Sequence, residues 1–180
     1  NWIIPGTAIG FLWSWIFNGQ YGVLNGILTS LGILKEGIPW LGQTGTALGC
    51  VVIARTWQML PWYMAFLLGG LQGVSLEQVE AARVDGANRF QTLVRIIVPC
   101  IKDTIATNTM LNTLSTLGVF GLIYAMTGGG PGSSTTTLPI FMYNQGLKGL
   151  QLGYGTAIGM LILLVGAVCS VIYTRILKDQ

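Results

Sequence analysis

Apolar runs alternate with short polar connectors along the chain, and four runs approach the length of a membrane-spanning helix. They cover residues 2–17, 46–70, 103–126 and 154–177. A hydrocarbon core of about 30 Å requires roughly 20 residues of helix, so the last three runs are long enough to cross it. The first run is shorter and is not preceded by a basic segment. We therefore expect the chain to begin inside a span and not with a signal peptide.

Turn-forming residues mark the connectors between these runs. A glycine-rich turn at residues 128–132 separates the third run from the fourth. The serine and threonine residues 133–137 follow it. No internal repeat and no long linker is present. The pattern predicts an all-α integral membrane protein, with residues 1–180 forming a single transmembrane domain. Within it we expect about four transmembrane helices and a helix-turn-helix in residues 75–99.

The distribution of basic residues predicts the orientation of the chain. Connectors on one side hold only Lys35 and Lys148. On the other side the segment between the second and third runs, together with the C-terminal end, holds Arg83, Arg89, Arg95, Lys102, Arg175 and Lys178. Loops rich in lysine and arginine stay in the cytoplasm. The helix-turn-helix and the C-terminus are thus predicted to be cytoplasmic, and the glycine-rich turn to lie outside.

The cytoplasmic segment has signals for two short helices. Ser75 followed by Gln78 predicts a capping box that starts a helix at Leu76, and Gly86 supplies the turn that ends it. Asn88 followed by Gln91 repeats the arrangement. In the second helix one apolar face, which we expect to pack on the membrane domain, is formed by Phe90, Leu93, Val94 and Ile97. Pro99 suits the start of the next helix.

Composition supports a membrane protein and argues against other classes. Hydrophobic residues make up 52% of the chain, charged residues only 8%, and mean hydropathy is +0.65. The net charge is +3, but the nine lysine and arginine residues are scattered among the apolar runs and form no basic stripe of the kind that binds nucleic acid. The sequence contains no histidine, and its three cysteines lack metal-site spacing, so we expect no metal site and three small buried thiols.

The predicted helix-turn-helix in residues 75–99 resembles the EAA motif of ATP-binding-cassette importer permeases. The pattern E-A-A-x3-G-x9-I-x-L-P is matched by Glu80, Ala81, Ala82, Gly86, Ile96, Val98 and Pro99, with Val98 in place of the usual leucine. In that family the first short helix docks on a nucleotide-binding subunit, a helix-in-groove contact that needs a rigid helix. The resemblance implies that the ATPase-docking residues are Glu80, Ala81, Ala82, Arg83, Asp85 and Gly86.

Other segments are similar to the sugar-importer branch of this family, and to its maltose-transporter type of subunit. The similar segments are Phe17-Asn18 with Tyr21-Gly22 and Asn25, Trp57, the turn at 126–131, and residues 134–137. Family members usually have about six spans, so the resemblance implies that N-terminal spans are missing from this chain. It also implies a multi-pass protein of the bacterial cytoplasmic (inner) membrane.

The resemblance carries further expectations about partners and cofactors. They are a second permease subunit, ATP-binding subunits, an external solute-binding protein, the lipid bilayer and a carbohydrate substrate. No cofactor is expected on this chain, because the glycine-rich stretch at 128–132 lacks the Gly-Lys-Ser/Thr ending of a phosphate loop. ATP and magnesium would bind the partner ATPase, so the chain is expected not to be an enzyme.

Substrate-pathway positions also follow from the resemblance. They are Trp2, Gly6, Arg55, Gln58, Met59, Trp62, Asn112, Thr116 and Val119. Arg55 is the strongest candidate, because an arginine at mid-bilayer is unfavourable by about 2.5–3.5 kcal/mol and should face a water-filled path or a partner. A cation there would suit an anionic carbohydrate. The rival interpretation is that a carboxylate on a partner subunit neutralises it.

Several alternatives remain open at the level of sequence. Asn108, Asn112 and Thr116 share one helix face, which would either line the path or hydrogen-bond a neighbouring span. Gly155 and Gly159 favour close helix packing. A permease for a non-sugar solute, an ion-coupled secondary transporter and a non-transporting membrane subunit are the competing functions. An ion-coupled transporter would more often carry an acidic residue at mid-span, and none is present.

Overall fold

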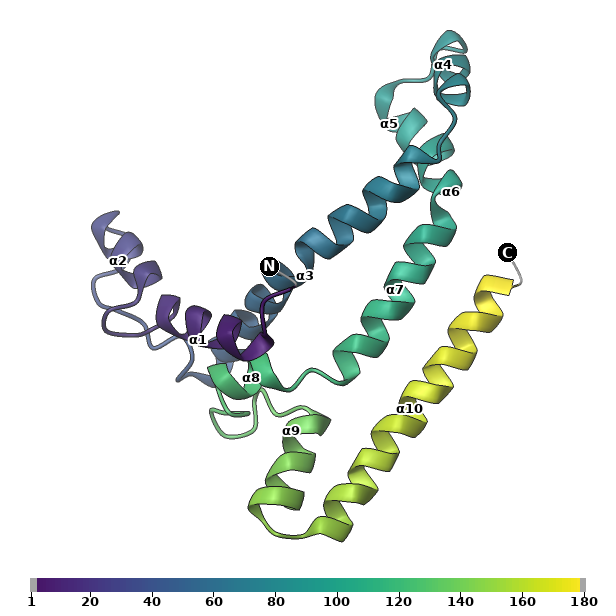
Figure 1. Cartoon of the computed structure of the whole chain (residues 1–180). Helices are drawn as coiled ribbons and strands as arrows, with labels where there is room; N and C mark the ends of the chain where they lie inside the picture. Colours follow the sequence, from purple (N-terminus) through teal and green to yellow (C-terminus); the bar gives the residue numbers. More distant parts are fainter. Residues whose placement is uncertain (1–2, 179–180) are drawn as a thin grey trace.

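The computed structural model describes residues 3–178, with side chains described through residue 175, and its regular elements are all helical. The all-α prediction is confirmed. Figure 1 shows the order of the helices and the open arrangement of the chain. The elements are α1 (Gly6–Ile16), α2 (Val23–Ser30), α3 (Thr44–Gln72), α4 (Leu76–Val84), α5 (Arg89–Thr92), η1 (Leu93–Ile97), α6 (Val98–Cys100), α7 (Lys102–Leu117), α8 (Gly121–Met126), α9 (Leu138–Tyr143), η2 (Asn144–Lys148) and α10 (Leu152–Lys178).

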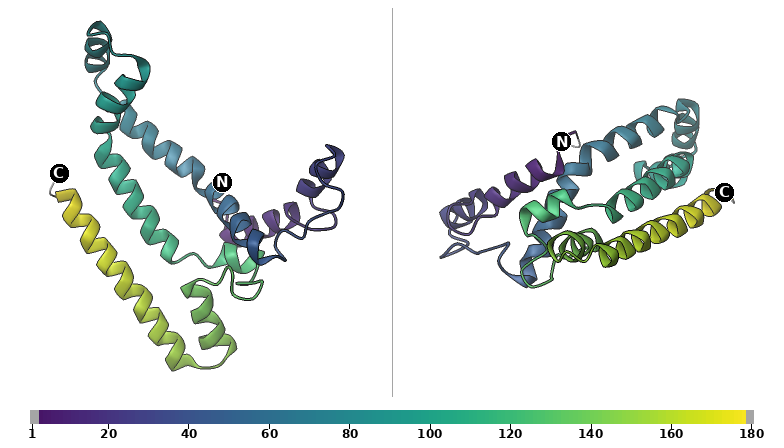
Figure 2. Two further views of the ribbon diagram at one scale, coloured as in Figure 1. Left: turned by 180° about the vertical axis from the view of Figure 1, so that it is seen from behind. Right: turned by 60° about the horizontal axis from the view of Figure 1, so that its bottom comes forward.

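Three long helices give the chain its main axis. Helices α3, α7 and α10 lie side by side, with α7 contacting both of the others (Figures 1 and 2). Helices α4 and α5 and the C-terminal end of α10 lie toward one end of this layer. The loop after α8, helix α9 and η2 lie toward the other, as the predicted alternation of connectors requires.

Length and composition identify fewer spans than the sequence pattern predicts. Among the described residues one helix, over residues 152–175, is long and apolar enough to cross a membrane. Helix α3 passes the same test only together with α4, which bends away from it by 74°. Helix α1 is apolar but spans 11 residues. The fourth predicted span is confirmed as a helix, and α3 matches the second within a few residues.

The third predicted span is wrong as one continuous helix. Helix α7 ends at Leu117, the chain changes direction through residues 118–120, and α8 begins at Gly121. The physical reason is the packing of α8 across α1. A Cβ built on Gly10 of α1 would lie 2.6 Å from Ala125 Cβ and 2.8 Å from the Leu122 carbonyl oxygen, so only glycine permits this approach.

The core lies where α1, α3 and α8 cross. Ile9, Leu122 and Ile140 have relative exposures of 0–2%, and Ala54 of α3 is fully buried beside them. Most other large apolar side chains of the long helices are exposed, including Leu163 of α10 at 74%. Exposed apolar helix surfaces of this kind suit a lipid environment or further subunits.

The connector after the glycine-rich turn contains structure that the sequence pattern did not predict. Helix α9 and the π-helix η2 fold back against α10. A Cβ on Gly155 would lie 2.6 Å from Gly146 Cα, and one on Gly159 would lie 3.3 Å from Met142 Sδ. The predicted close packing at Gly155 and Gly159 is confirmed, and the segment that packs against these two glycines is formed by α9 and η2.

The connector between α1 and α3 is ordered by one buried amide. Asn25 on α2 is 3% exposed, and its Nδ2 donates to the carbonyl oxygens of Asn18, Gly19 and Ile38 at 3.2, 3.0 and 2.9 Å. Its Oδ1 accepts from Ile38 N at 3.2 Å and Trp40 Nε1 at 2.8 Å. One side chain thus replaces the regular backbone bonds that the loop cannot form.

Candidate functional site

A cavity of about 370 Å³ lies between α3, α7 and α8, and we call it the α3–α7 cavity. Helix α3 supplies most of its wall, while α7, α8 and the loops flanking α8 supply the rest. The lining residues are Leu48, Val51, Val52, Arg55, Thr56, Met59, Tyr63, Asn112, Thr116, Val119, Ile123 and Thr137. An apolar wall with a few convergent polar groups is typical of a small-molecule site.

The cavity brings together five of the nine predicted pathway residues, namely Arg55, Met59, Asn112, Thr116 and Val119. Three others lie outside its wall. Gln58 and Trp62 project from other faces of α3, and Gly6 lies in α1, where an added Cβ would lie 4.0 Å from Gln58 Nε2. Trp2 lies outside the described residues. The predicted positions therefore supply three of the six polar side chains in the lining, those of Arg55, Asn112 and Thr116, and do not all share the cavity.

Arg55 is held by one neighbour on its own helix. Its Nη1 donates to Gln58 Oε1 at 2.8 Å, and Gln58 Nε2 in turn donates to the Ile4 carbonyl oxygen at 3.5 Å. Gln58 is 5% exposed, so the residue acts here as a buried support for the guanidinium. Arg55 Nε is buried and has no hydrogen-bond partner in the described part of the chain.

The polar face of α7 divides between the two roles that the sequence left open. Asn108 is 2% exposed, and its Oδ1 accepts a hydrogen bond from Trp62 Nε1 of α3 at 3.1 Å. Asn112 and Thr116, one and two turns further along, line the cavity. Asn108 therefore joins two helices, and only the other two face open space.

Several lining residues were not predicted. Leu48, Val52 and Tyr63 lie at intervals of three or four along α3 together with Arg55 and the predicted Met59, so the helical period from Arg55 would have found them. Thr137 follows the glycine-rich turn, and no signal in the sequence places it beside α3. Its Oγ1 is buried and without a partner among residues 3–178.

Thr137 reaches the cavity because the loop before it is tightly organised. Thr127 and Thr135 hydroxyls lie 2.6 Å apart, and Thr135 also donates to the Gly130 carbonyl oxygen at 2.8 Å. Thr136 donates to the Gly129 carbonyl oxygen at 2.9 Å. Gly129 has φ +99°, and a Cβ there would lie 2.8 Å from Thr136 Oγ1, so this turn requires glycine.

A second candidate site is the coupling segment, residues 75–100, at the far end of α3 and α7 from the glycine-rich turn. Helix α4 carries Glu80, Ala81, Ala82 and Arg83, followed by Asp85 and Gly86 in the turn. Five of these six residues are exposed, and Ala82 is half-buried. Gly86 has φ +84°, the left-handed conformation that a helix-ending glycine adopts.

The predicted caps of the two short helices have different outcomes. Asn88 Oδ1 accepts from Gln91 N at 2.8 Å and Gln91 Oε1 accepts from Asn88 N at 2.9 Å, which confirms the second capping box. The first box is wrong, because the Ser75 side chain makes no cap hydrogen bond. Gln78 instead accepts a contact from Cys100 Sγ at 3.5 Å. The prediction that all three cysteines are buried is confirmed only for Cys50, because Cys100 is exposed and Cys169 is half-buried.

The second short helix continues further than predicted. Helix α5 passes directly into η1 and then α6, and Pro99 is the second residue of α6, which confirms its predicted place at a helix start. Proline lacks an N–H and crowds the preceding turn, and a wider turn accommodates it. The predicted apolar face does not pack on the membrane domain. Three of its four residues, Phe90, Leu93 and Val94, are 73%, 46% and 47% exposed, and only Ile97 is half-buried.

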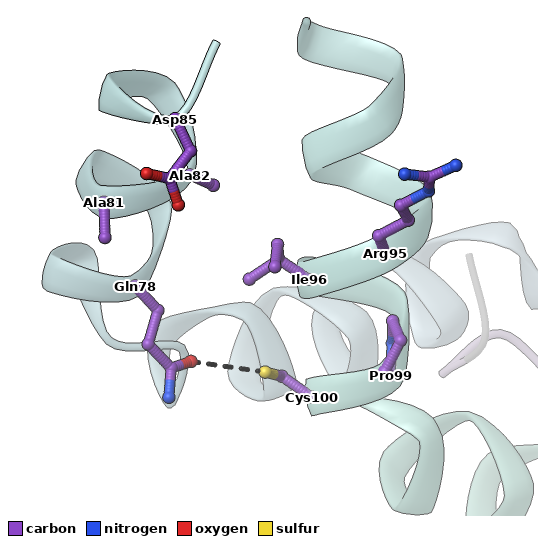
Figure 3. A pocket seen from close by; sticks show the side chains of 8 residues that line it. All are labelled: Gln78, Ala81, Ala82, Asp85, Arg95, Ile96, Pro99 and Cys100. Atoms are coloured by element: carbon purple, nitrogen blue, oxygen red, sulfur yellow. Dashed lines mark hydrogen bonds between the residues drawn. The ribbon is translucent and has the colours of Figure 1, made fainter. Parts of the chain in front are cut away.

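A groove of about 530 Å³ separates α4 from the following helical segment. Gln78, Ala81, Ala82 and Asp85 line one side, and Arg95, Ile96, Pro99 and Cys100 line the other. In Figure 3, Ile96 points toward α4 and the Arg95 guanidinium points away from it. Helix α4 is thus connected to the membrane helices mainly through its two ends.

No group of three or more potential metal ligands occurs among the described residues. The two candidate sites differ in chemistry, since the α3–α7 cavity carries a cation and hydroxyl groups and the coupling segment presents an exposed helical surface.

Comparison with known proteins gives a consistent assignment. A family model described as "Binding-protein-dependent transport system inner membrane component" matches residues 2–179. The permease protein of the sulfoquinovosyl glycerol transport system of Agrobacterium fabrum is 33% identical over 179 residues, covering 99% of this chain and 58% of that protein. The trehalose/maltose transport system permease protein of Thermococcus litoralis is 33% identical over 175 residues, covering 97% and 58%.

Solved structures share the fold. The chain superposes with a TM-score of 0.87 and 23% identity on a bacterial ABC transporter involved in the import of the acidic polysaccharide alginate, covering 98% of this chain and 62% of that one. A structure of the alginate transporter in complex with an alginate pentasaccharide-bound periplasmic protein gives a TM-score of 0.85 at 24% identity, covering 96% and 60%.

The chain spans less than two thirds of the length of the two curated relatives described. The family match nevertheless covers nearly every residue of the chain. The chain belongs to the family of binding-protein-dependent transport system inner membrane components, the membrane subunits of ABC importers.

Proposed function

We propose that this chain forms part of the translocation path of an ABC importer for a sugar or oligosaccharide. The observation that carries the proposal is the pairing of two sites on the same two helices. Helices α3 and α7 line the α3–α7 cavity and are joined at one end by the exposed coupling segment. A membrane subunit moved by a separate motor needs both features.

A carbohydrate is the proposed substrate class for two reasons. Relatives at 33% identity are permeases of sulfoquinovosyl glycerol and trehalose/maltose systems. The cavity also offers suitable groups, since Asn112, Thr116 and Thr137 can exchange hydrogen bonds with sugar hydroxyls and the Tyr63 ring can pack against a pyranose face.

The proposed partners follow from the family and from the exposed surfaces. A second permease subunit would complete the path, ATP and magnesium would bind partner ATPase subunits, and an external solute-binding protein would deliver the sugar. The bilayer would cover the apolar faces, with the coupling segment and C-terminus in the cytoplasm. Glu80 to Gly86 of α4 and its turn would dock on the ATPase as a helix in a groove.

Co-purification of the full-length permease with its ATPase tests the docking assignment. Glu80→Ala combined with Gly86→Val should remove most of the ATPase from the complex, because it deletes an exposed charge and strains the φ +84° turn. Gln72→Ala, just before the segment, is the matched control and should leave ATPase recovery unchanged. Full ATPase recovery with the double variant would show that docking lies elsewhere.

Transport by the purified complex in proteoliposomes tests the function itself. Uptake of a panel of neutral and acidic sugars should require external solute-binding protein and internal ATP together. Uptake driven by an ion gradient without ATP would instead indicate a secondary transporter. Absence of ATP-dependent uptake for every sugar in the panel would contradict the carbohydrate assignment.

A further inference from the structure

Two polar groups in the wall of the α3–α7 cavity lack hydrogen-bond partners in the described part of the chain. They are the Nε–H of Arg55 and the hydroxyl of Thr137, which come from α3 and from the loop before α9. Buried donors and acceptors are paired in nearly all folded proteins. Both groups belong to residues that line the same cavity, so a molecule bound there can supply the missing partners.

The orientation of the guanidinium specifies the kind of partner. Arg55 uses Nη1 to bond Gln58, so the edge formed by Nε and Nη2 is left without an acceptor in residues 3–175. This edge presents two parallel N–H groups, the arrangement that binds a carboxylate, sulfonate or phosphate with two hydrogen bonds. Gln58 is 5% exposed and fixes the side chain in this orientation.

The charge of Arg55 is also uncompensated within the described chain. Helix α3 contains no acidic residue, and the acidic residue nearest in sequence to the cavity on α7 is Asp103, more than two turns before Asn112. A cation in an apolar surrounding is unfavourable without a counterion. A neutral sugar would supply hydrogen-bond acceptors but no counterion.

We infer that the solute carries an anionic group, which binds the free edge of Arg55, while Thr137 and the polar residues of α7 bind its hydroxyl groups. This inference rests on the proposed function, because it names the substrate class of the same cavity. It makes charge, and not only sugar shape, a determinant of what the permease moves.

The wild-type protein provides the first test. The complete importer with its solute-binding protein is assayed in proteoliposomes with three pairs of sugars that differ in charge: trigalacturonate and its methyl ester, glucose 6-phosphate and glucose, and a 6-sulfonated glucoside and the parent glucoside. Since charge-assisted bidentate bonds are about twice as strong as neutral ones, the acidic member of at least one pair should be preferred by about tenfold or more. Transport of neutral members with no acidic preference in any pair overturns the inference.

Variants locate the preference on Arg55. Arg55→Gln should abolish the preference for the acidic member, and Arg55→Lys, which keeps the charge but loses the planar fork, should retain part of it. Thr137→Val should weaken acidic and neutral members by the same factor. Lys148→Gln is the control for net charge, because Lys148 lies over the Tyr124 and Tyr143 rings, 5.1 and 5.6 Å from their centroids, and does not line the cavity.

The outcomes separate this inference from the proposed function. If no sugar of either charge is taken up, the carbohydrate function fails. If neutral sugars are taken up and Arg55→Gln lowers both members of every pair equally, the function stands and the anion inference fails. That second result would assign Arg55 to an ion pair with a partner subunit. If Arg55→Gln does not assemble, the wild-type preference and Arg55→Lys still decide the matter.

Discussion

Trp62 Nε1 donates a hydrogen bond to Asn108 Oδ1 at 3.1 Å and thereby joins α3 to α7. Asn108 is almost fully buried, so water does not compete for this contact. Along α7 the bond lies between the coupling segment and the α3–α7 cavity, and along α3 it lies at the end of the cavity nearest that segment. It sets the spacing of the two helices that carry both candidate sites.

Replacement of Asn108 by leucine should destabilise the helix pair. Hydrogen bonds between membrane helices contribute about 0.6 kcal/mol on average and up to about 1.7 kcal/mol, and a loss in this range is expected. Thermal unfolding of the purified permease measures it. Thr107→Val, on the exposed side of α7, is the control and should change stability by less than about 0.5 kcal/mol. Equal effects of the two substitutions would mean that the Trp62 contact is not structural.

The contact of α1 with α8 should not tolerate a methyl group at residue 10. An alanine Cβ would lie 2.6 Å from Ala125 Cβ and 2.8 Å from the Leu122 carbonyl oxygen. Gly10→Ala should destabilise the domain by roughly 1–3 kcal/mol through overpacking. Gly49→Ala in α3 has no atom within 4 Å of the new Cβ and should be neutral or slightly stabilising. Each substitution adds one methyl group to a helix. A change in stability of opposite sign in the two variants, measured by thermal unfolding, would therefore isolate the packing effect.

The two helix caps of the coupling segment should respond differently to alanine. Asn88→Ala removes a complete capping box and should destabilise α5 by about 1 kcal/mol. Ser75→Ala removes a side chain that makes no cap bond and should have a smaller effect. Hydrogen exchange of the backbone amides of residues 89–92 and 76–79 reports each helix separately. Faster exchange of residues 76–79 in Ser75→Ala would show that Ser75 caps α4 after all.

Asn25→Ala should loosen the whole connector between α1 and α3. The amide makes five hydrogen bonds, and its loss leaves carbonyl groups and the Trp40 indole N–H unpaired. Each buried group left unpaired is unfavourable by about 1–3 kcal/mol, part of which rearrangement will recover. Limited proteolysis between residues 18 and 43 measures the effect. Gln20→Ala, exposed in the same loop, is expected to leave the cleavage rate unchanged.

Sequence reasoning worked best where one local rule decides the structure. The length of the apolar runs located α3 and α10, and the spacing of Asn88 and Gln91 predicted a capping box that forms. The helix-ending role of Gly86 was also correct, since positive φ is a local property. The polar residues of α7 stood out because such residues are rare in apolar surroundings, but the sequence did not separate Asn108, which joins two helices, from Asn112 and Thr116, which line the cavity.

It failed where contacts distant in sequence decide. The break at residues 118–120 depends on α8 packing against Gly10, more than 100 positions earlier. The fold of α9 on α10 depends on Gly146 meeting Gly155, and Thr137 reaches the cavity only through the hydrogen bonds of the preceding turn. Ser75 has the right residue type for a cap, yet its helix begins without using it.

Helix α3 is uninterrupted from Thr44 to Gln72 and carries Arg55 near its middle, with Pro61 between Arg55 and the coupling segment. Arg55 lies about 25 Å along the axis from the last residue of the helix. A stiff helix of this length moves both ends in a single step, whereas bending at Pro61 would let one end move alone. Under the proposed function, the number of ATP molecules hydrolysed per solute delivered should therefore depend on the bending stiffness of α3 at Pro61, a residue that does not line the cavity.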